Sequence, residues 1–271
     1  MHNEPAVNTL SRRIHLMKIK QIHSPNQNSR IRSIVLHYTA LDLSQTLKRL
    51  TDSSSQVSAH YVVSNECDTA LSYPIYQLVP DDQRAWHAGI SHWRGMGNLN
   101  SESIGIEVVN LAYPPEDEYT PISMRRWQPY PDGQIEAVAQ LVKHLALKYN
   151  IAPKNIVGHS DIAPTRKIDP GPLFPWQKLY EKYEVGAWPD GDVVEYFLQK
   201  QPFDGNLESL LKKLQRYGYG YPGASVDSTQ VDDKVKPIIQ AFQLHFQPNH
   251  ITGVPDHQTV AILDALLEKY N

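Results

Sequence analysis

Residues 33–38, with the sequence Ser33-Ile34-Val35-Leu36-His37-Tyr38, decide the fold. Three branched aliphatic side chains follow one another in this stretch. A short apolar run of this kind predicts a strand that is buried in a sheet. His37 stands near the end of the run, so an ionisable side chain is expected at the edge of a buried core.

Four further stretches have the composition of strands, and helical patterns lie between them. The additional strands are predicted at residues 59–63, 75–79, 103–109 and 155–159. A long helix is expected between the last two, capped by Asp132, because apolar residues recur there at helical spacing: Ile135, Val138, Val142, Leu145 and Tyr149. Shorter helices are expected at residues 43–52 and 176–183. Strands mixed with helices predict an α/β domain built on a central sheet.

The composition changes near residue 184. Glycine and proline interrupt residues 185–205, which we expect to form a connector with one short helix at 193–198. Strand patterns end there, and three amphipathic helical stripes follow in residues 206–271. They predict a small three-helix bundle that docks on the first domain, because so few residues give only marginal stability alone. Polar residues 1–30 are expected to form an N-terminal extension, which leaves 31–184 for the α/β domain.

Composition and charge exclude several classes of protein. Hydrophobic residues make up 41% of the 271 residues and charged residues 20%, which excludes a disordered chain. The formal net charge of −3 argues against binding to nucleic acid through bulk positive charge. No apolar run approaches the roughly 20 residues that span a bilayer. The first residues carry no export signal, so we expect either a cytoplasmic protein or one whose signal was removed from this sequence. Cys67 is the only cysteine, so no disulfide can form within the chain.

Three residues have the chemistry of metal ligands. His37 and His159 end predicted strands, and Asp169 follows in a proline-rich loop. Two imidazoles and one carboxylate suit Zn²⁺, and three protein ligands leave a fourth tetrahedral position open, as in catalytic zinc sites. The spacing alone does not require a metal, because a single histidine at the end of a strand is more often part of a core or a surface.

Three other residues have both a structural and a functional interpretation. Glu107 interrupts an apolar strand, so it is either half of a buried salt bridge or a general base for an attacking water. Lys167 precedes Asp169 by two residues and is either solvated or stabilises the oxyanion of a tetrahedral intermediate. Trp86 lies in a glycine-rich stretch and either folds onto the core or contacts a sugar or peptide.

Together these residues resemble the zinc N-acetylmuramoyl-L-alanine amidases of the amidase-2 family, which shares its fold with the peptidoglycan recognition proteins. The resemblance extends over about residues 31–176 and implies a mixed central β-sheet flanked by helices. Each motif is weak alone, but the combination is specific. The motifs are Leu36-His37-Tyr38-Thr39-Ala40, Ser58-Ala59-His60-Tyr61, Arg84-Ala85-Trp86-His87-Ala88-Gly89, Ser103-Ile104-Gly105-Ile106-Glu107, Gly158-His159-Ser160-Asp161-Ile162-Ala163-Pro164 and Asp169-Pro170-Gly171-Pro172.

The resemblance implies a role for each candidate residue. It assigns one catalytic Zn²⁺ to His37, His159 and Asp169. It assigns the acid/base role to Glu107 and the stabilisation of the oxyanion to Lys167. Four residues are implied to line the substrate-binding groove: Tyr38, His60, Trp86 and Asn110. The implied reaction is hydrolysis of the amide bond between L-alanine and N-acetylmuramic acid, or its 1,6-anhydro form, in cell-wall turnover.

The C-terminal region has a resemblance of its own. Ala241-Phe242-Gln243-Leu244-His245-Phe246, followed by Gly253 and Thr259, is similar to the three-helix peptidoglycan-binding domain. A catalytic domain followed by this domain resembles the two-domain AmiD-type enzymes. That resemblance implies a periplasmic protein, held at the outer membrane as a lipoprotein, whose signal is absent from this sequence; a cytoplasmic protein is the alternative. Peptidoglycan and muropeptides are the expected partners, and we expect a monomer.

Other functions remain open on the sequence alone. A relative of this fold without catalytic activity would bind peptidoglycan and leave it intact. A zinc peptidase would cleave within the stem peptide. The C-terminal bundle either binds peptidoglycan or only braces the catalytic domain.

Overall fold

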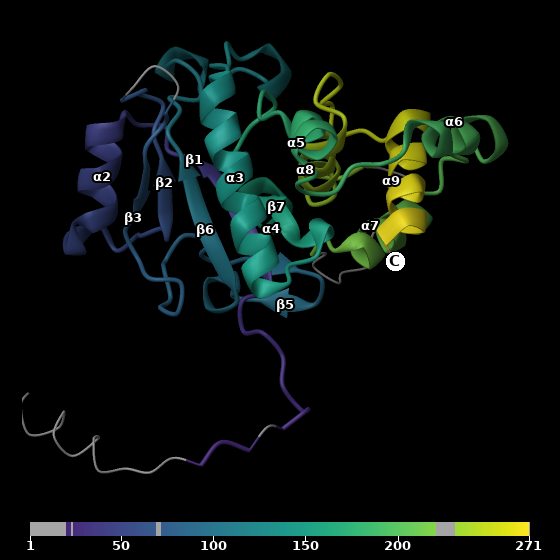
Figure 1. Cartoon of the computed structure of the whole chain (residues 1–271). Coiled ribbons are helices and arrows are strands. Elements are labelled where there is room, and N and C mark those ends of the chain that lie inside the picture. Colours follow the sequence, from purple (N-terminus) through teal and green to yellow (C-terminus); the bar gives the residue numbers. More distant parts are fainter. Residues whose placement is uncertain (1–19, 23, 69–71, 221–230, 271) are drawn as a thin grey trace, which may run out of the picture.

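A five-stranded sheet lies at the centre of the computed structural model, which describes residues 20–22, 24–68, 72–220 and 231–270 (Figure 1). The strand order is β3-β2-β6-β1-β7. Pairing is parallel throughout except between β2 and β3, which run antiparallel. The strands are β1 (Ser33–Tyr38), β2 (Tyr61–Val63), β3 (Ile75–Gln77), β6 (Ser103–Val108) and β7 (Ile156–Gly158). This mixed sheet confirms the predicted fold class.

Helices flank the sheet and make up most of the C-terminal region. They are α2 (Leu43–Thr51), α3 (Asp132–Tyr149), α4 (His159–Ile162), α5 (Trp176–Tyr183), α6 (Gly191–Lys200), α7 (Leu207–Tyr217), α8 (Lys236–Phe246) and α9 (His257–Tyr270). Short 3-10 turns lie at Ser53–Ser55, Leu99–Ser101, Pro115–Asp117, Ile122–Met124 and Pro153–Asn155. In Figure 1, α3 crosses the sheet, and α6 and α9 lie at the end of the molecule opposite α2.

Alternation of side chains along β1 and β6 separates the two faces of the sheet. Residues of even number, such as Leu36 and Ile106, belong to a buried cluster that also contains the apolar side chains of α3. Residues of odd number point to the opposite face, because successive strand residues alternate. In the parallel register of β1 with β6, His37 is the partner of Glu107. These two polar side chains therefore project from the face that α3 leaves free.

A second hydrophobic core joins the sheet to the C-terminal helices. Val35 and Val157 belong to one buried cluster with apolar residues of α6, α7, α8 and α9. α6 is longer than the short helix expected at 193–198 and buries Val194 and Phe197 in this core. The C-terminal helices therefore dock on the sheet, as expected for a bundle of marginal size.

Local predictions differ from the structure at several places, of which three bear on the site or its surroundings. Pro131, not Asp132, is the N-cap of α3, and Asp132 is the first helical residue, where its carboxylate pairs with Lys178 at 2.7 Å. His159 does not end the fifth strand but begins α4, because sheet pairing stops at Gly158. The hairpin of β4 (His92–Trp93) and β5 (Met96–Gly97) was not predicted, since two-residue strands are too short for a recognisable pattern.

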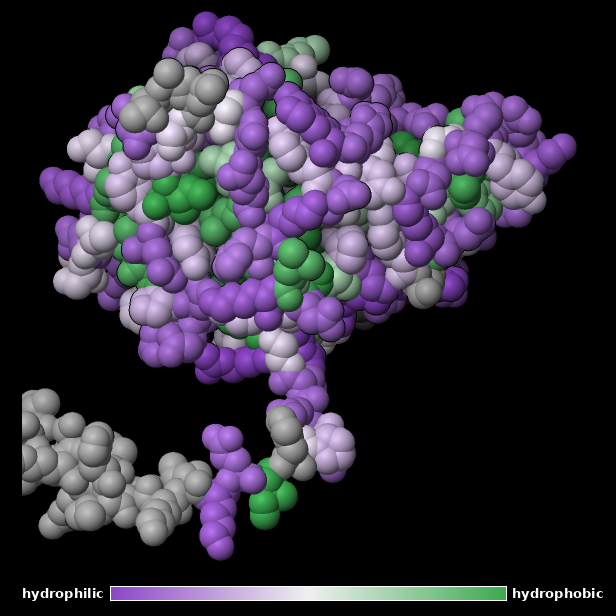
Figure 2. All heavy atoms as spheres, in the orientation of Figure 1, coloured by the Kyte–Doolittle hydropathy of each residue, from purple (hydrophilic) through white to green (hydrophobic). Residues whose placement is uncertain are grey.

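Among the residues that the structure describes, no helix is both long enough and apolar enough to cross a membrane. In the view of Figure 2, hydrophilic residues cover most of the surface and hydrophobic residues appear in separate groups. Exposed apolar side chains thus do not merge into one broad face on that side.

Candidate active site and metal centre

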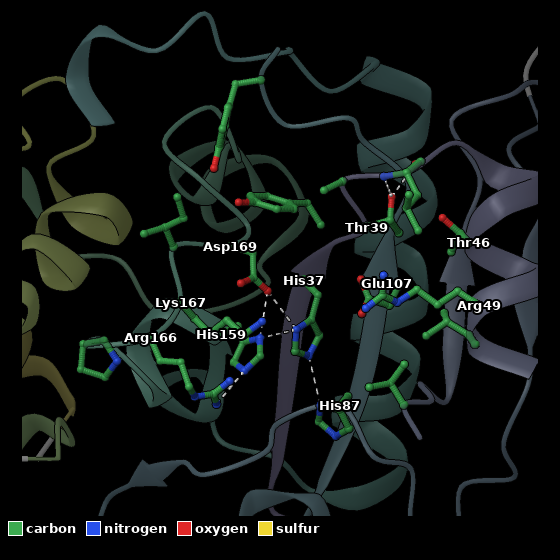
Figure 3. Close-up of a pocket in the computed structure, with 18 of the residues that line it drawn as sticks. His37, Thr39, Thr46, Arg49, His87, Glu107, His159, Arg166, Lys167 and Asp169 are labelled. Atoms are coloured by element: carbon green, nitrogen blue, oxygen red, sulfur yellow. Dashed lines mark hydrogen bonds and ion pairs between the residues drawn. The ribbon is translucent and has the colours of Figure 1, made fainter. Parts of the chain in front are cut away.

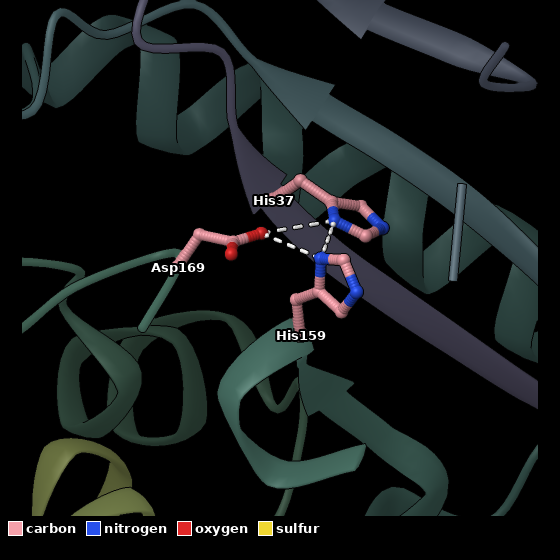
Figure 4. Close-up of side chains that lie close together, drawn as sticks. All are labelled: His37, His159 and Asp169. Carbon is pink, nitrogen blue, oxygen red and sulfur yellow. Dashed lines mark hydrogen bonds and ion pairs between the residues drawn. The ribbon is translucent and has the colours of Figure 1, made fainter. Parts of the chain in front are cut away.

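Three buried side chains from separate segments meet at one point (Figure 4). His37 comes from the end of β1, His159 from the first residue of α4, and Asp169 from the loop after α4. His37 Nδ1 lies 2.9 Å from His159 Nδ1, and each of these nitrogens lies 3.0 Å from Asp169 Oδ2. The fold thus brings together the three residues predicted as metal ligands, although more than 120 residues separate His37 from His159.

The carbonyl group of Ala88 determines which nitrogen of His159 carries the proton. His159 Nε2 lies 3.1 Å from that oxygen. Because a carbonyl oxygen only accepts, Nε2 must donate, and Nδ1 of the neutral ring keeps its lone pair toward Asp169. Arg166 donates to the same carbonyl and to that of Ile90, both at 2.8 Å, which holds the loop of Ala88 against the site.

A series of hydrogen bonds from Ser103 through His87 determines the proton position on His37, and Figure 3 shows its last contact, between His87 and His37. Ser103 Oγ donates to the carbonyl of Leu99 at 2.6 Å, so it accepts from His87 Nε2 at 3.2 Å. His87 therefore presents the lone pair of Nδ1 to His37 Nε2, which lies 3.0 Å away and donates. Burial, followed by the neighbouring histidines, lowers the pKa of His87 well below its usual value, which keeps it neutral. Nδ1 of His37 is then left without a proton and faces Asp169.

These proton positions leave three electron-pair donors directed at one another. Two imidazole lone pairs and a carboxylate oxygen repel at such short distances unless a cation lies among them. Neutral imidazole nitrogens and a carboxylate oxygen are the ligands that zinc prefers. His37, His159 and Asp169 are therefore able to hold a divalent metal ion, and their donor set fits zinc.

Electrostatics favour the same protonation states. Burial, then the proximity of His159, lowers the pKa of His37 to about 4, although Asp169 partly opposes the shift. Burial alone raises the pKa of Asp169, but attraction to His159 and His37 and their hydrogen bonds outweigh it and lower that pKa below its usual value. Near neutral pH, His37 is thus neutral and Asp169 is ionised, which are the states that bind a metal.

Glu107 lies beside His37 in the sheet and lines the same cavity. Its Oε2 atom is buried and has no hydrogen-bond partner among the described residues. Burial, then the charge of Asp169, raises the pKa of Glu107 well above its usual value, while Lys167 and Arg49 act in the opposite direction. A partly buried carboxyl with a raised pKa and one unpaired oxygen has the properties of a general acid or base.

Lys167 lines the cavity with Glu107 and Asp169, and Figure 3 shows it on the loop that carries Asp169. Its positive charge lowers the pKa of both His37 and Glu107, so its influence reaches both sides of the site. A cation at this place is able to stabilise negative charge that develops beside the metal ligands.

The site opens into a groove of about 690 Å³. One wall comes from α2, with Thr46 and Arg49. Pro237 and Gln240 of α8 also line the groove, together with the loop that carries Tyr113 and Arg125. The groove therefore has walls from both the α/β region and the C-terminal helices, and it offers charged and aromatic side chains to a ligand.

Of the four residues predicted to bind substrate, Tyr38 and Trp86 line this groove, and Trp86 is 52% exposed.

The other two, His60 and Asn110, are buried and do not line the groove. The ring of His60 accepts from the backbone N–H of Gly105 and donates to the carbonyl of Gln83. The side chain of Asn110 is likewise bonded to backbone groups, at Ala112 and Gln128. The polar atoms of His60 and Asn110 thus hold loops in place.

Several residues of the site and groove were not predicted from the sequence, among them His87, Arg49 and Arg125. His87 lies next to Trp86 in a recognised motif, and its being the one histidine of that motif was the available signal. Arg49 lies on the exposed side of α2, where an arginine is ordinary. Arg125 stacks over Tyr113 at 4.4 Å and donates to the carbonyl of Glu118 at 2.7 Å, contacts that depend on loop packing.

Comparison with known proteins matches both parts of the chain to families. Residues 27–172, more than half of the chain, match the family described as N-acetylmuramoyl-L-alanine amidase. The chain belongs to the N-acetylmuramoyl-L-alanine amidase family. Residues 204–263 match the family described as "Putative peptidoglycan binding domain". These matches confirm the predicted resemblance to the amidases.

Relatives within the amidase family resemble the chain over most of its length. N-acetylmuramoyl-L-alanine amidase AmiD of Escherichia coli (strain K12) is 43% identical over 246 residues, which are 89% of this chain and 84% of the relative. The solved complex of E. coli AmiD with anhydro-N-acetylmuramic acid-L-Ala-D-gamma-Glu-L-Lys has a TM-score of 0.81 at 41% identity and covers 92% of this chain and 93% of that one. AmpDh3 of Pseudomonas aeruginosa in complex with anhydromuramic pentapeptide also has a TM-score of 0.81, at 37% identity, over 94% of this chain and 99% of that one.

Proposed function

We propose that the protein is a zinc-dependent amidase that hydrolyses the bond between L-alanine and N-acetylmuramic acid, or its 1,6-anhydro form. One observation carries the proposal: His37, His159 and Asp169 direct three unprotonated donor atoms at one point, beside Glu107, whose Oε2 atom has no hydrogen-bond partner among the described residues. Membership of the amidase family supports the reaction. The solved complexes of two relatives with anhydromuramyl peptides support the class of substrate.

Each residue of the site has a separate role in the proposed hydrolysis. Zinc held by His37, His159 and Asp169 would polarise the amide carbonyl and lower the pKa of water to about 7. Glu107 accepts the proton of the attacking water, because its carboxyl has a raised pKa and its Oε2 atom has no hydrogen-bond partner in the described part of the chain. Lys167 stabilises the negative charge that forms on the carbonyl oxygen. Glu107 then delivers the proton to the leaving amino group of L-alanine.

We assign substrate contacts to Tyr38 and Trp86, which both line the groove. The half-exposed indole of Trp86 offers an apolar face to a sugar ring or a stem peptide. The earlier prediction for His60 and Asn110 has no comparable support, because backbone groups occupy their polar atoms.

We infer that the enzyme acts on peptidoglycan and muropeptides in the periplasm, which the similarity to AmiD supports. In our division of the chain, residues 31–184 form the catalytic domain, 185–205 the connector and 206–271 a peptidoglycan-binding domain, in line with the family match to 204–263. Anchoring at the outer membrane and the monomeric state stay predictions. Membrane fractionation tests the first, and light scattering of the purified protein tests the second.

Mass spectrometry of muropeptides incubated with the purified protein tests the proposed reaction. We expect release of intact stem peptides that begin with the free amino group of L-alanine, together with a peptide-free muramyl product. Elemental analysis should find one zinc ion per chain. Cleavage between two amino acids of the stem would instead identify a peptidase. Intact muropeptides, with no zinc in the protein, would favour a peptidoglycan-binding protein without catalytic activity.

A further inference from the structure

Asp161 is a buried carboxylate that has no part in the proposed reaction, yet it lies two residues after the ligand His159. It belongs to α4, the short helix that begins with His159, and it is fully buried. Its Oδ2 atom accepts from the backbone N–H of Gly158 at 2.7 Å, which fixes the start of the helix. The N–H of Ser160, in the same turn, donates to the carbonyl of Asp169 at 2.9 Å. The backbone of α4 therefore positions two of the three metal ligands.

Two residues of the C-terminal region complete the hydrogen bonding of Asp161. Tyr219, just after α7, donates its hydroxyl to Oδ1 at 2.6 Å. His245, in α8, donates from Nδ1 to Oδ2 at 2.7 Å. They lie 58 and 84 residues away in the sequence, within the region that matches the peptidoglycan-binding family. Two of the three donors to this buried charge thus come from outside the catalytic α/β region.

Aromatic packing holds both donors in place. The ring of His245 stacks between Trp176, at 3.9 Å, and Phe246, at 4.0 Å. The ring of Tyr219 meets Trp93 edge-on at 5.1 Å and is almost completely buried. Rotation of either side chain away from Asp161 would break these ring contacts. Each hydrogen bond therefore has a defined geometry.

The cost of an unpartnered charge explains why these bonds matter. A buried carboxylate is costly unless its oxygens accept hydrogen bonds. Without the hydroxyl of Tyr219, Oδ1 of Asp161 has no donor left in the described part of the chain. The carboxylate would rotate in search of another partner and weaken its bond to Gly158. Because His159 and the carbonyl of Asp169 are attached to the same turn, both ligands would move with it.

We propose that Tyr219 and His245 are positioning residues of the metal centre, through which the C-terminal helices control its affinity for zinc. This role is additional to any contact of those helices with peptidoglycan. It rests on the proposed function, because it takes His159 and Asp169 as metal ligands. This positioning role also gives a physical reason for the shared core. The C-terminal helices, whose residues Pro237 and Gln240 line the groove, also hold α4, the turn that begins with His159.

The test compares full-length variants by two measurements that do not require turnover. Competition with a chelator after removal of the metal gives the affinity for zinc, and the visible absorption of the cobalt-substituted protein reports ligand geometry. Tyr219→Phe and His245→Phe each remove one donor and keep an aromatic ring. We expect each to weaken zinc binding about tenfold or more and to shift the cobalt bands. Tyr217→Phe is the matched control, because its ring lies 6.4 Å from that of Tyr219 and it makes no hydrogen bond to Asp161 in the described structure.

The outcomes separate this inference from the proposed function. Unchanged zinc affinity and an unchanged cobalt spectrum in Tyr219→Phe would overturn the inference and leave the amidase function standing. An equal loss of affinity in Tyr217→Phe would also overturn it, since general loosening of the core would then be the cause. Wild-type protein that binds no zinc and cleaves no muropeptide would overturn both. If His245→Phe does not fold, Tyr219→Phe, which lacks a single oxygen atom, decides the question.

Discussion

His87 Nδ1 accepts a hydrogen bond from His37 Nε2 at 3.0 Å. The direction of this bond follows from the hydrogen bonds on the other side of the His87 ring. There Ser103 donates to the carbonyl oxygen of Leu99, which only accepts, so Ser103 must accept from His87. A backbone oxygen at Leu99 thereby determines which nitrogen of His37 faces Asp169. His87 acts on the metal centre through His37, and this relationship leads to the first prediction.

Replacement of His87 should lower the affinity for zinc, and the loss should depend on whether the new side chain accepts a hydrogen bond from His37. His87→Ala leaves the N–H of His37 without an acceptor, and we expect zinc binding to weaken roughly 10- to 100-fold. His87→Asn should retain more affinity, because its amide oxygen lies near the position of Nδ1 and accepts the same proton. Chelator competition with the metal-free proteins measures both values. Equal affinities of His87→Ala and the wild type would contradict the tautomer argument.

Replacement of Glu107 should separate metal binding from turnover. We expect Glu107→Ala to retain one zinc ion and to lose a factor of about 10² to 10⁴ in kcat, the usual effect of removing a general base. Elemental analysis and a kinetic assay on a muramyl peptide measure the two properties. Glu136→Gln, on the exposed side of α3, is the control and should behave as the wild type. Full activity in Glu107→Ala would remove this residue from the mechanism.

A methyl group at Gly105 should displace His87 and so disturb the site. A Cβ atom there would lie 2.3 Å from the ring of His87, which is too close for any side-chain contact. We expect Gly105→Ala to destabilise the fold by about 1 to 3 kcal/mol and to weaken zinc binding, because His87 must move. Thermal unfolding and chelator competition measure the two effects. Gly97→Ala serves as control, since its new Cβ would only meet the carbonyl of Ser91 at 3.9 Å; a similar loss there would show that the effect is not specific.

Asp81 should stabilise the fold in a way that depends on pH. Its carboxylate accepts from Tyr61, Tyr149 and Lys148 at 2.6 to 2.8 Å. Burial alone would raise the pKa of Asp81, but these hydrogen bonds outweigh burial and lower the pKa to about 2. The unfolded chain has the ordinary aspartate pKa of about 3.9. A lowered pKa means that the stabilisation is complete above that value and is lost as the pH falls toward 2.

Asp81→Asn should therefore reduce the free energy of unfolding at pH 7 by about 1 to 2 kcal/mol, after allowance for solvent screening at the half-exposed Lys148. Urea unfolding of both proteins at a series of pH values gives the difference. We expect it to shrink between pH 4 and pH 2. A difference that stays constant over this range would mean that the ionised carboxylate is not its source.

The sequence predicts the bounds of several elements to within one residue. β1 and α5 have the predicted bounds, and α2 ends one residue before its predicted end. Errors concentrate where the chain changes direction. His159 was predicted as a strand residue because Ile156 and Val157 favour a strand, but it begins a helix. Apolar patterning cannot detect that change, since the turn depends on hydrogen bonds to Asp161 and Asp169 that form only in the folded chain.

The prediction of site residues likewise depended on residue types and local motifs, and it missed what contacts between distant segments decide. The residue types and motifs were sufficient to select His37, His159, Asp169 and Glu107, which the fold brings together. They do not reveal that the ring of His60 bonds to the backbone at Gly105 and Gln83, or that His87 hydrogen-bonds to His37. Both are histidines in recognised motifs, and what separates them is which atoms surround each ring.

By itself, the amino-acid sequence determined the order of strands and helices, the family, and the side chains with metal-binding and proton-transfer chemistry, because periodicity and residue type act locally along the chain. Only the tertiary structure decided that Nδ1 of both His37 and His159 faces Asp169, and that Oε2 of Glu107 has no hydrogen-bond partner among the described residues. It also decided that Tyr219 and His245 donate to Asp161, in the turn that begins with His159. The physical reason is that hydrogen-bond direction and the cost of burying charge depend on neighbours from distant segments, which become neighbours only when the chain folds.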